Sequence, residues 1–232
     1  MPAHANVPAL RLDRSRHAAP QVFEKLRELI VALQLAPGTV LSRAELAQRF
    51  GVSQTPIRDA LIKLGEEDLV DIYPQHATLV SRIDVTAARQ AHFLRRAIEL
   101  EVVRTLAARP DEALVGKLRA QTDLQAAVMD ADDYRDFVAA DQAFHRLMYE
   151  AADVAGLWDL VRRTSGHVDR LRRLDLPSAG KAQAVVRDHR RLLDAIARGD
   201  ADAAQVRLRE HLSGTLGKID EICKRYPQFV VR

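Results

Sequence analysis

The sequence is poor in cysteine and has no long apolar run. Cys223 is the only cysteine among 232 residues, which excludes an intramolecular disulfide and a zinc cluster built from thiolates. Nowhere do about 18 apolar residues follow one another, so no transmembrane helix is predicted. The segment MPAHANVPALRLDRSRHAAP carries proline and charge where a signal peptide has an apolar stretch. We therefore expect a cytoplasmic protein with no membrane partner.

The sequence also lacks a strong excess of charge of one sign. Its 35 lysine and arginine residues face 32 aspartates and glutamates, a net charge of +3. Acids and bases nearly balance over residues 17–82, whereas the preceding segment has Arg11, Arg14 and Arg16 against Asp13. Any binding to nucleic acid must therefore depend on where single residues lie rather than on bulk charge.

The apolar pattern divides the chain into parts, and its length suits two domains of modest size. Residues 1–16 lack a steady apolar period and predict a flexible arm. Residues 17–81 show three helical patterns, the first ending near Leu35, and then an alternating one. Residues 84–225 predict an all-α bundle of about six helices, so the fold class is mainly α. The helices are expected over 84–108, 111–129, 132–151, 155–175, 178–198 and 200–224.

Residues 17–81 predict a winged helix-turn-helix. Ser42 followed three positions later by Glu45 is the capping box of the second helix. Gly51 supplies the left-handed turn that ends this helix, and Ser53 is well placed to cap the third. After the third helix, LVDIYPQHATLV alternates apolar and polar residues on either side of a break, which predicts a β-hairpin.

The start of the third helix, in FGVSQTPIRDAL, is rich in hydrogen-bonding side chains. A helix-turn-helix places the first residues of its second helix against base edges in the major groove. Gln54 can pair with an adenine edge, Arg58 with guanine or a phosphate, and Ser53 and Thr55 with phosphates. Pro56 lies in the first turn, where its missing amide costs little. These residues therefore predict a DNA-reading surface.

A plain structural explanation of the same residues stays open. Ser53 can act only as a cap, and Arg58 can pair with Asp59 or Glu66 on the surface, because capped polar helix starts are common. The run of helix, turn, helix and hairpin is more specific than any of its parts and favours DNA binding.

The run LAQRFGVSQTPIRDAL resembles the hallmark of the GntR family of bacterial transcription regulators, and the resemblance spans nearly all of residues 20–81. The family usually has arginine where this chain has Gln54, a change expected to alter base or phosphate contacts. It also has a wing-tip glycine where this chain has Ala77, a change that bears on the wing's approach to the minor groove. The predicted DNA-binding residues are Arg43, Ser53, Gln54, Thr55, Pro56, Arg58, His76 and Thr78.

A possible metal site lies in the helical part. Asp141 and His145 stand four residues apart and therefore project from one face of a helix. His189 and His211 lie on two later helices. If these helices face one another, one carboxylate and three imidazoles converge, a set suited to zinc, nickel or a similar ion. From spacing alone, solvated or singly hydrogen-bonded histidines remain an equal alternative.

The sequence from Asp84 to about Arg225 is similar to the FadR-type C-terminal ligand-binding domain of one large GntR subfamily. Many members hold a metal with one aspartate and three histidines, at the positions matched by Asp141, His145, His189 and His211. In that family a small carboxylate effector completes the coordination. The resemblance implies a divalent metal, zinc first with nickel or manganese as alternatives, and an acidic ligand.

Three arginines are candidates for holding the effector. Arg95 matches a family position that often points into the pocket, where a guanidinium can clamp a carboxylate. Arg170 and Arg173 are further candidates of the same kind. The alternative for Arg95 is an ion pair with Glu99 along the helix surface.

Taken together, the sequence predicts a transcription regulator, a repressor in the commoner arrangement, that binds a near-palindromic operator as a homodimer and responds to a small organic acid. It predicts no enzyme. A metal-dependent hydrolase stays an alternative, although the chain lacks a general base such as the glutamate of an H-E-x-x-H helix. A second alternative is a constitutive DNA-binding protein whose bundle only dimerises.

Overall fold

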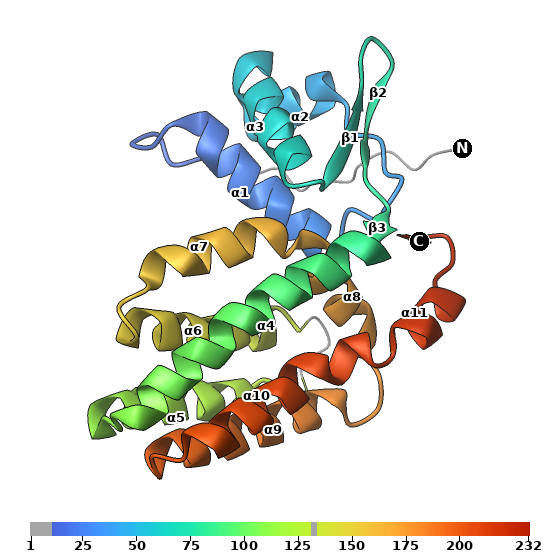
Figure 1. The fold of residues 1–232 in the computed structure, drawn as a ribbon. Coiled ribbons are helices and arrows are strands. Elements are labelled where there is room, and N and C mark those ends of the chain that lie inside the picture. The colour runs from blue at the N-terminus through green and yellow to red at the C-terminus, as the bar shows by residue number, and fades with distance from the viewer. Residues whose placement is uncertain (1–10, 131–133) are drawn as a thin grey trace. The chain divides into compact units, whose positions relative to one another are not determined.

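The computed structural model describes residues 11–130 and 134–232 (Figure 1). It is mainly helical, as predicted, with a winged helix-turn-helix followed by a helical domain. The chain forms two compact units. The N-terminal unit comprises Met1–Ala88, Gly166–Arg173 and Cys223–Arg232, and the C-terminal unit comprises Arg89–Ser165 and Leu174–Ile222. No helix in the described ranges is both long and apolar enough to cross a membrane.

The first three helices are α1 (Ala18–Val31), α2 (Arg43–Phe50) and α3 (Gln54–Glu66), and both α1 and α2 pack on α3. Their apolar faces form one buried core, in which Leu26 and Ile57 have no exposed surface. Helix α1 ends before the predicted Leu35, because the chain turns away at residues 32–35.

Two sequence signals of this region have the predicted geometry. The hydroxyl of Ser42 accepts a hydrogen bond from the backbone amide of Glu45 at 3.3 Å, which caps the start of α2. Gly51 ends the same helix at φ 65°, a left-handed conformation that a side chain disfavours. The connection between α2 and α3 is therefore fixed by local chemistry.

The wing is an antiparallel hairpin of β1 (Val70–Tyr73) and β2 (Ala77–Val80). Ala77 pairs with Tyr73 inside the ladder, and the left-handed residue of the turn is Gln75, at φ 61°. Glycine is therefore not required at position 77 by the backbone of this turn.

A second, two-stranded sheet was not predicted. Strand β3 (Ile83–Asp84) pairs in parallel with β4 (Val230–Val231), and the amide of Ile83 donates to the carbonyl of Phe229 at 2.8 Å. The helix expected over 84–108 therefore begins at Val85, because Asp84 belongs to β3, and β4 lies beyond the segment 84–225 for which helices were expected. Two-residue strands carry too short a pattern to be recognised in a sequence.

The remaining helices follow the predicted order. Helix α5 packs on α6 and α9, and α9 packs on α10 (Figure 1). Buried side chains from several helices, such as Leu118, Phe144 and Ile196, form the core of the C-terminal unit. The helices are α4 (Val85–Ala108), α5 (Glu112–Ala127), α6 (Arg135–Ala151), α7 (Ala155–Thr164), α8 (Gly166–Asp175), α9 (Lys181–Ala197), α10 (Ala201–Leu216) and α11 (Ile219–Arg225).

Two predicted helices are each divided in two. The segment 155–175 breaks between α7 and α8, where the hydroxyls of Thr164 and Ser165 donate to backbone carbonyls three residues earlier. Such bonds compete with the helical pattern. The segment 200–224 breaks after Leu216, where Gly217 separates α10 from α11.

The first two turns of α8 belong to the N-terminal unit and are held there by a buried arginine. Arg170 has no exposed surface, and its guanidinium donates to the carbonyl of Ser81 at 2.7 Å and to its hydroxyl at 3.2 Å. The Nδ1 atom of His167 accepts from the amide of Asp84 at 3.0 Å. Burial, followed by the charge of Arg170, lowers the pKa of His167 to about 4, so this nitrogen remains an acceptor at neutral pH.

A glycine permits this close approach of α8. A Cβ atom at Gly166 would lie 2.6 Å from Cδ2 and 3.2 Å from Cγ of the fully buried Leu69. A Gly166→Ala variant should therefore lose about 1 kcal/mol of unfolding free energy, because overpacking costs about 1 to 3 kcal/mol and helix propensity returns up to about 1. Chemical denaturation measures this change.

Gly116 is the matched control, since it lies inside α5 and a Cβ atom there meets nothing within 4 Å. Gly116→Ala should instead stabilise the protein by about 0.5 to 1 kcal/mol. Equal stabilisation by both substitutions would show that the Leu69 side chain can move aside without any loss of unfolding free energy.

Candidate functional site

The start of α3 exposes polar side chains next to a buried apolar face. Ser53 occupies the N-cap position with extended backbone, but its hydroxyl makes no capping hydrogen bond. Gln54 and Thr55 are exposed, as is Arg58, whereas Ile57 is fully buried. The expected cap is therefore absent, and the Ser53 hydroxyl points to no backbone amide of its own helix.

Arg58 has a weak partner. Its guanidinium lies 3.3 Å from Oδ1 of Asp59, and the side chains are 61% and 47% exposed. Such an exposed pair contributes only about 0 to 1 kcal/mol, so Arg58 can exchange it for a phosphate or a base. Pro56 is half-buried in the first turn of α3, as expected for a residue without an amide proton.

The remaining predicted DNA-binding residues lie on α2 and the wing. Arg43 is the first residue of α2 and is exposed. His76 is exposed in the hairpin turn, whereas Thr78 is half-buried in β2. The beginning of α3 and the tip of the wing lie at the same end of the N-terminal unit (Figure 1). Polar side chains of α2, α3 and the wing therefore belong to one unit, and those of α3 and the wing tip lie toward one end of it.

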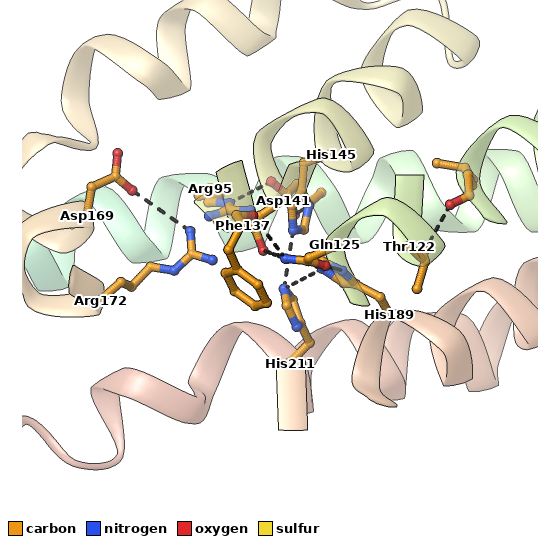
Figure 2. A network of polar contacts seen from close by, with 12 residues as sticks. Arg95, Thr122, Gln125, Phe137, Asp141, His145, Asp169, Arg172, His189 and His211 are labelled. Atoms are coloured by element: carbon orange, nitrogen blue, oxygen red, sulfur yellow. Dashed lines mark hydrogen bonds and ion pairs between the residues drawn. The ribbon is translucent and has the colours of Figure 1, made fainter. Parts of the chain in front are cut away.

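The four predicted metal ligands converge in the C-terminal unit. Asp141 and His145 project from α6, His189 from α9 and His211 from α10, and all four are buried (Figure 2). Nε2 of His211 lies 3.2 Å from Nε2 of His145 and 3.3 Å from Nε2 of His189. One potential ligand atom from each residue lies within 4.8 Å of the other three.

Two side chains from other helices orient two of the three imidazoles, those of His145 and His189. Oε2 of Glu99, on α4, lies 3.0 Å from Nδ1 of His145, and Oε1 of Gln125, on α5, lies 2.8 Å from Nδ1 of His189. Both oxygens are acceptors, so each Nδ1 carries the proton. The Nε2 lone pairs of both histidines therefore face the centre of the cluster, the arrangement found around metal-bound histidines.

The spacing of these atoms fits a transition-metal ion. Three nitrogens bound about 2.1 Å from one ion, at angles of about 90 to 110°, lie about 3.0 to 3.4 Å apart. The observed separations of 3.2 and 3.3 Å fall within this interval. Three imidazoles and a carboxylate are also the donors that zinc and similar borderline ions prefer.

A buried ion pair supports the cluster. Arg95 donates from Nε to Oε1 of Glu99 at 2.6 Å, and the hydroxyl of Tyr149 donates to the same oxygen at 3.3 Å. Burial alone would raise the pKa of Glu99, but the charge of Arg95 and the hydrogen bonding of Arg95 and His145 to this carboxylate outweigh it and lower this pKa to about 2. Glu99 is therefore a carboxylate inside the unit. The ion pair of Arg95 with Glu99 therefore exists, but it is buried in the C-terminal unit instead of lying on the helix surface.

The other two arginines proposed for the effector are placed elsewhere. Arg170 and Arg173 group with the N-terminal unit, and the guanidinium of Arg170 forms hydrogen bonds with Ser81, Gly166 and His167. The structure thus brings Arg95 close to the ligand quartet through Glu99 and His145, whereas Arg170 stabilises the attachment of α8.

Sequence reasoning missed Glu99 and Gln125 as partners of the histidines. Glu99 was considered only as a partner of Arg95, four residues away on the same helix. Gln125 carries no recognisable signal, because it meets His189 across 64 positions of sequence. Only the packing of α5 against α9 brings the amide to the imidazole.

Comparisons with known proteins agree with this geometry. The profile of "Bacterial regulatory proteins, gntR family" matches residues 18–80, and the profile of the FCD domain matches residues 90–214. An HTH-type transcriptional regulator in an unstable DNA locus of Streptomyces ambofaciens is 37% identical, over 89% of this chain and 87% of that protein. The HTH-type transcriptional repressor RspR of Escherichia coli K12 is 32% identical, over 87% of this chain and 89% of that protein.

The fold is shared with a solved structure. E. coli McbR/YncC superimposes with a TM-score of 0.75 at 17% identity, and the match covers 91% of this chain and 99% of that one. The sequence relatives are transcription regulators and not enzymes. With a winged helix-turn-helix and an FCD domain, the chain belongs to the GntR family of DNA-binding transcription regulators.

Proposed function

We propose that the protein is a metal-dependent, ligand-responsive repressor that binds operator DNA as a homodimer in the cytoplasm. The observation that carries this proposal is the convergence of Asp141 and three histidine Nε2 atoms in a domain attached to a DNA-reading unit. The repressor assignment is supported by the name of the relative from E. coli. A two-fold dimer would read the two halves of a near-palindrome, about one helical turn apart.

The metal would be held by Asp141, His145, His189 and His211, with zinc as the first candidate and nickel or manganese as alternatives. A bound ion supplies a Lewis acid to which a carboxylate oxygen can bind. The protein's own part is orientation, since Glu99 and Gln125 hold the Nδ1 protons away from the centre.

The effector would be a small organic acid bound beside this centre. Arg95 is the candidate for its second contact, because its guanidinium binds Glu99, whose other oxygen lies 3.0 Å from Nδ1 of His145 in the quartet. Arg170 and Arg173, which were also candidates, group with the N-terminal unit and are not proposed as contacts of this effector. The acid would change operator occupancy only by binding the DNA-competent and DNA-incompetent states with different affinities.

The hydrolase alternative is less well supported. Glu99 is the carboxylate next to the histidine cluster, but Arg95 and His145 hold it as an ion of very low pKa. A general base near neutral pH needs a pKa close to that pH, so Glu99 is unsuited to the role. The second alternative, a constitutive DNA-binding protein, is distinguished from a ligand-responsive repressor by the metal and effector experiment described below.

Substituting Arg58 tests the DNA-reading surface. Arg58→Ala should weaken operator binding by about 1 to 3 kcal/mol if the guanidinium reads a base. Fluorescence anisotropy with an operator duplex selected from a random pool measures the change. Lys63→Ala, an exposed cation in the last turn of the same helix, should have a much smaller effect. Unchanged affinity of Arg58→Ala would remove this residue from the interface.

Removing two ligands tests the metal and effector site. The double variant His189→Ala, His211→Ala should lose bound metal and respond weakly to acids, while the protein still binds DNA. Elemental analysis measures the metal, and a thermal-shift screen of small organic acids with and without zinc measures the response, because a ligand of the native state raises Tm. His92→Ala is the control, since this histidine lies outside the quartet. Metal-free wild-type protein purified without chelator contradicts the proposal.

Glu99→Gln tests the orientation of His145 by replacing a charged acceptor with an amide of nearly equal shape. Metal affinity should fall about 10- to 100-fold, the usual effect of losing such a partner. Glu101→Gln is the matched control on the exposed face of α4. Competition with a chromogenic zinc chelator gives both affinities, and equal values would mean that Glu99 does not act through His145.

A further inference from the structure

A basic groove lies in the N-terminal unit beside the helix-turn-helix. Its volume is about 890 Å³, and it runs between the segment before α1 and the C-terminal end of α2. Four arginines line it, Arg11, Arg14, Arg16 and Arg49, against one acidic residue, Asp13. This concentration of cations contrasts with the nearly balanced charge of residues 17–82.

The segment before α1 has a defined shape where the structure describes it. The side-chain amide of Gln21 donates to the carbonyls of Asp13 at 2.8 Å and Arg16 at 3.1 Å, and its oxygen accepts from the Asp13 amide at 2.8 Å. Leu12 packs against the core of the unit. Residues 11–16 of the expected flexible arm are therefore folded onto the domain.

Of the three arginines in this segment, Arg11 and Arg14 can contact an anionic partner without breaking an ion pair within the described residues. Arg16 pairs with Glu24 at 2.9 Å. The carboxylate of Asp13 accepts from the hydroxyl and amide of Ser15, and these hydrogen bonds lower its pKa. Arg11 and Arg14 are exposed, and within residues 11–130 and 134–232 no ion pair engages either of them.

The first turn of α1 adds to the positive electrostatic potential of the groove. Ala18 lines the groove, no acidic residue lies in this turn, and the His17 side chain makes no capping bond. The positive end of the helix dipole therefore faces the groove together with the arginines.

The groove is continuous with the DNA-reading surface. Gly51 and Val52 line it, and the next residue, Ser53, begins the polar set at the start of α3. A duplex whose major groove receives the start of α3 continues past this turn with its phosphate backbone.

We propose that residues 11–16, with Arg49, form a second phosphate-binding surface, which contacts the DNA backbone outside the bases read by α3. This inference rests on the proposed function. Three of the four arginines, Arg11, Arg14 and Arg16, are exposed and follow one another along a single segment. Such a row of cations suits a row of phosphates better than one small anion, which needs groups that converge on one point. Contacts of this kind position the protein and add affinity without reading sequence.

The test combines charge removal with a change in DNA length. Arg11→Ala, Arg14→Ala should bind the selected operator about tenfold more weakly at low salt, with unchanged base preference. The slope of log K against log salt should become less steep by about one to two units, since each phosphate contact contributes about 0.9. Trimming the sequence flanking the half-sites should weaken the wild type but leave this variant unaffected, as coupled contacts require.

Two controls separate this inference from the proposed function. Arg119→Ala, Arg209→Ala removes the same charge from exposed positions in α5 and α10, and its salt slope should equal that of the wild type. If Arg58→Ala loses affinity and the variant of residues 11 and 14 does not, the second surface is refuted while operator reading stands. If the wild type itself selects no operator from the random pool, the proposed function fails together with this inference. Unchanged DNA binding with lost thermal stabilisation by inorganic pyrophosphate would assign the groove to a small anion and overturn the proposal.

Discussion

The negative charge of Glu99 determines which nitrogen His145 presents to the cluster in the C-terminal unit. A carboxylate without exposed surface needs partners, and it has them in Arg95, His145 and Tyr149. Because Oε2 of Glu99 is an acceptor 3.0 Å from Nδ1 of His145, the proton of this imidazole lies on Nδ1 and the other ring nitrogen is presented to the cluster as a lone pair. One ion pair thus couples the packing of α4 against α6 to the chemistry of the centre.

Much of the candidate metal site was predictable from the sequence, but not its geometry. The spacing of Asp141 and His145 places both on one face of α6, whatever the rest of the chain does. Whether His189 and His211 face them depends on how α9 packs on α10 and α5, which is a property of the whole core. The same holds for Gln125, because no sequence pattern marks a glutamine whose only signal is its contact with His189 in the folded core.

The fold shows the same division between local and non-local information. The capping box of Ser42 and the turn at Gly51 are local, and both were predicted. The division of α7 from α8 depends on hydroxyl bonds at Thr164 and Ser165 that an otherwise helical pattern conceals. The docking of α8 depends on the hydrogen bond of Arg170 to Ser81, which is 89 positions away, and no local sequence pattern predicts this contact.

The pairing of β3 with β4 has a consequence for the order of folding. The core of α1 to α3 and the hairpin consist of contacts close in sequence, which form early as the chain leaves the ribosome. Strand β3 must wait for residues near Val230, after the entire helical unit has been synthesised. The N-terminal unit can thus be completed only after the last residues of its second sheet have been synthesised, although its three-helix core needs none of them.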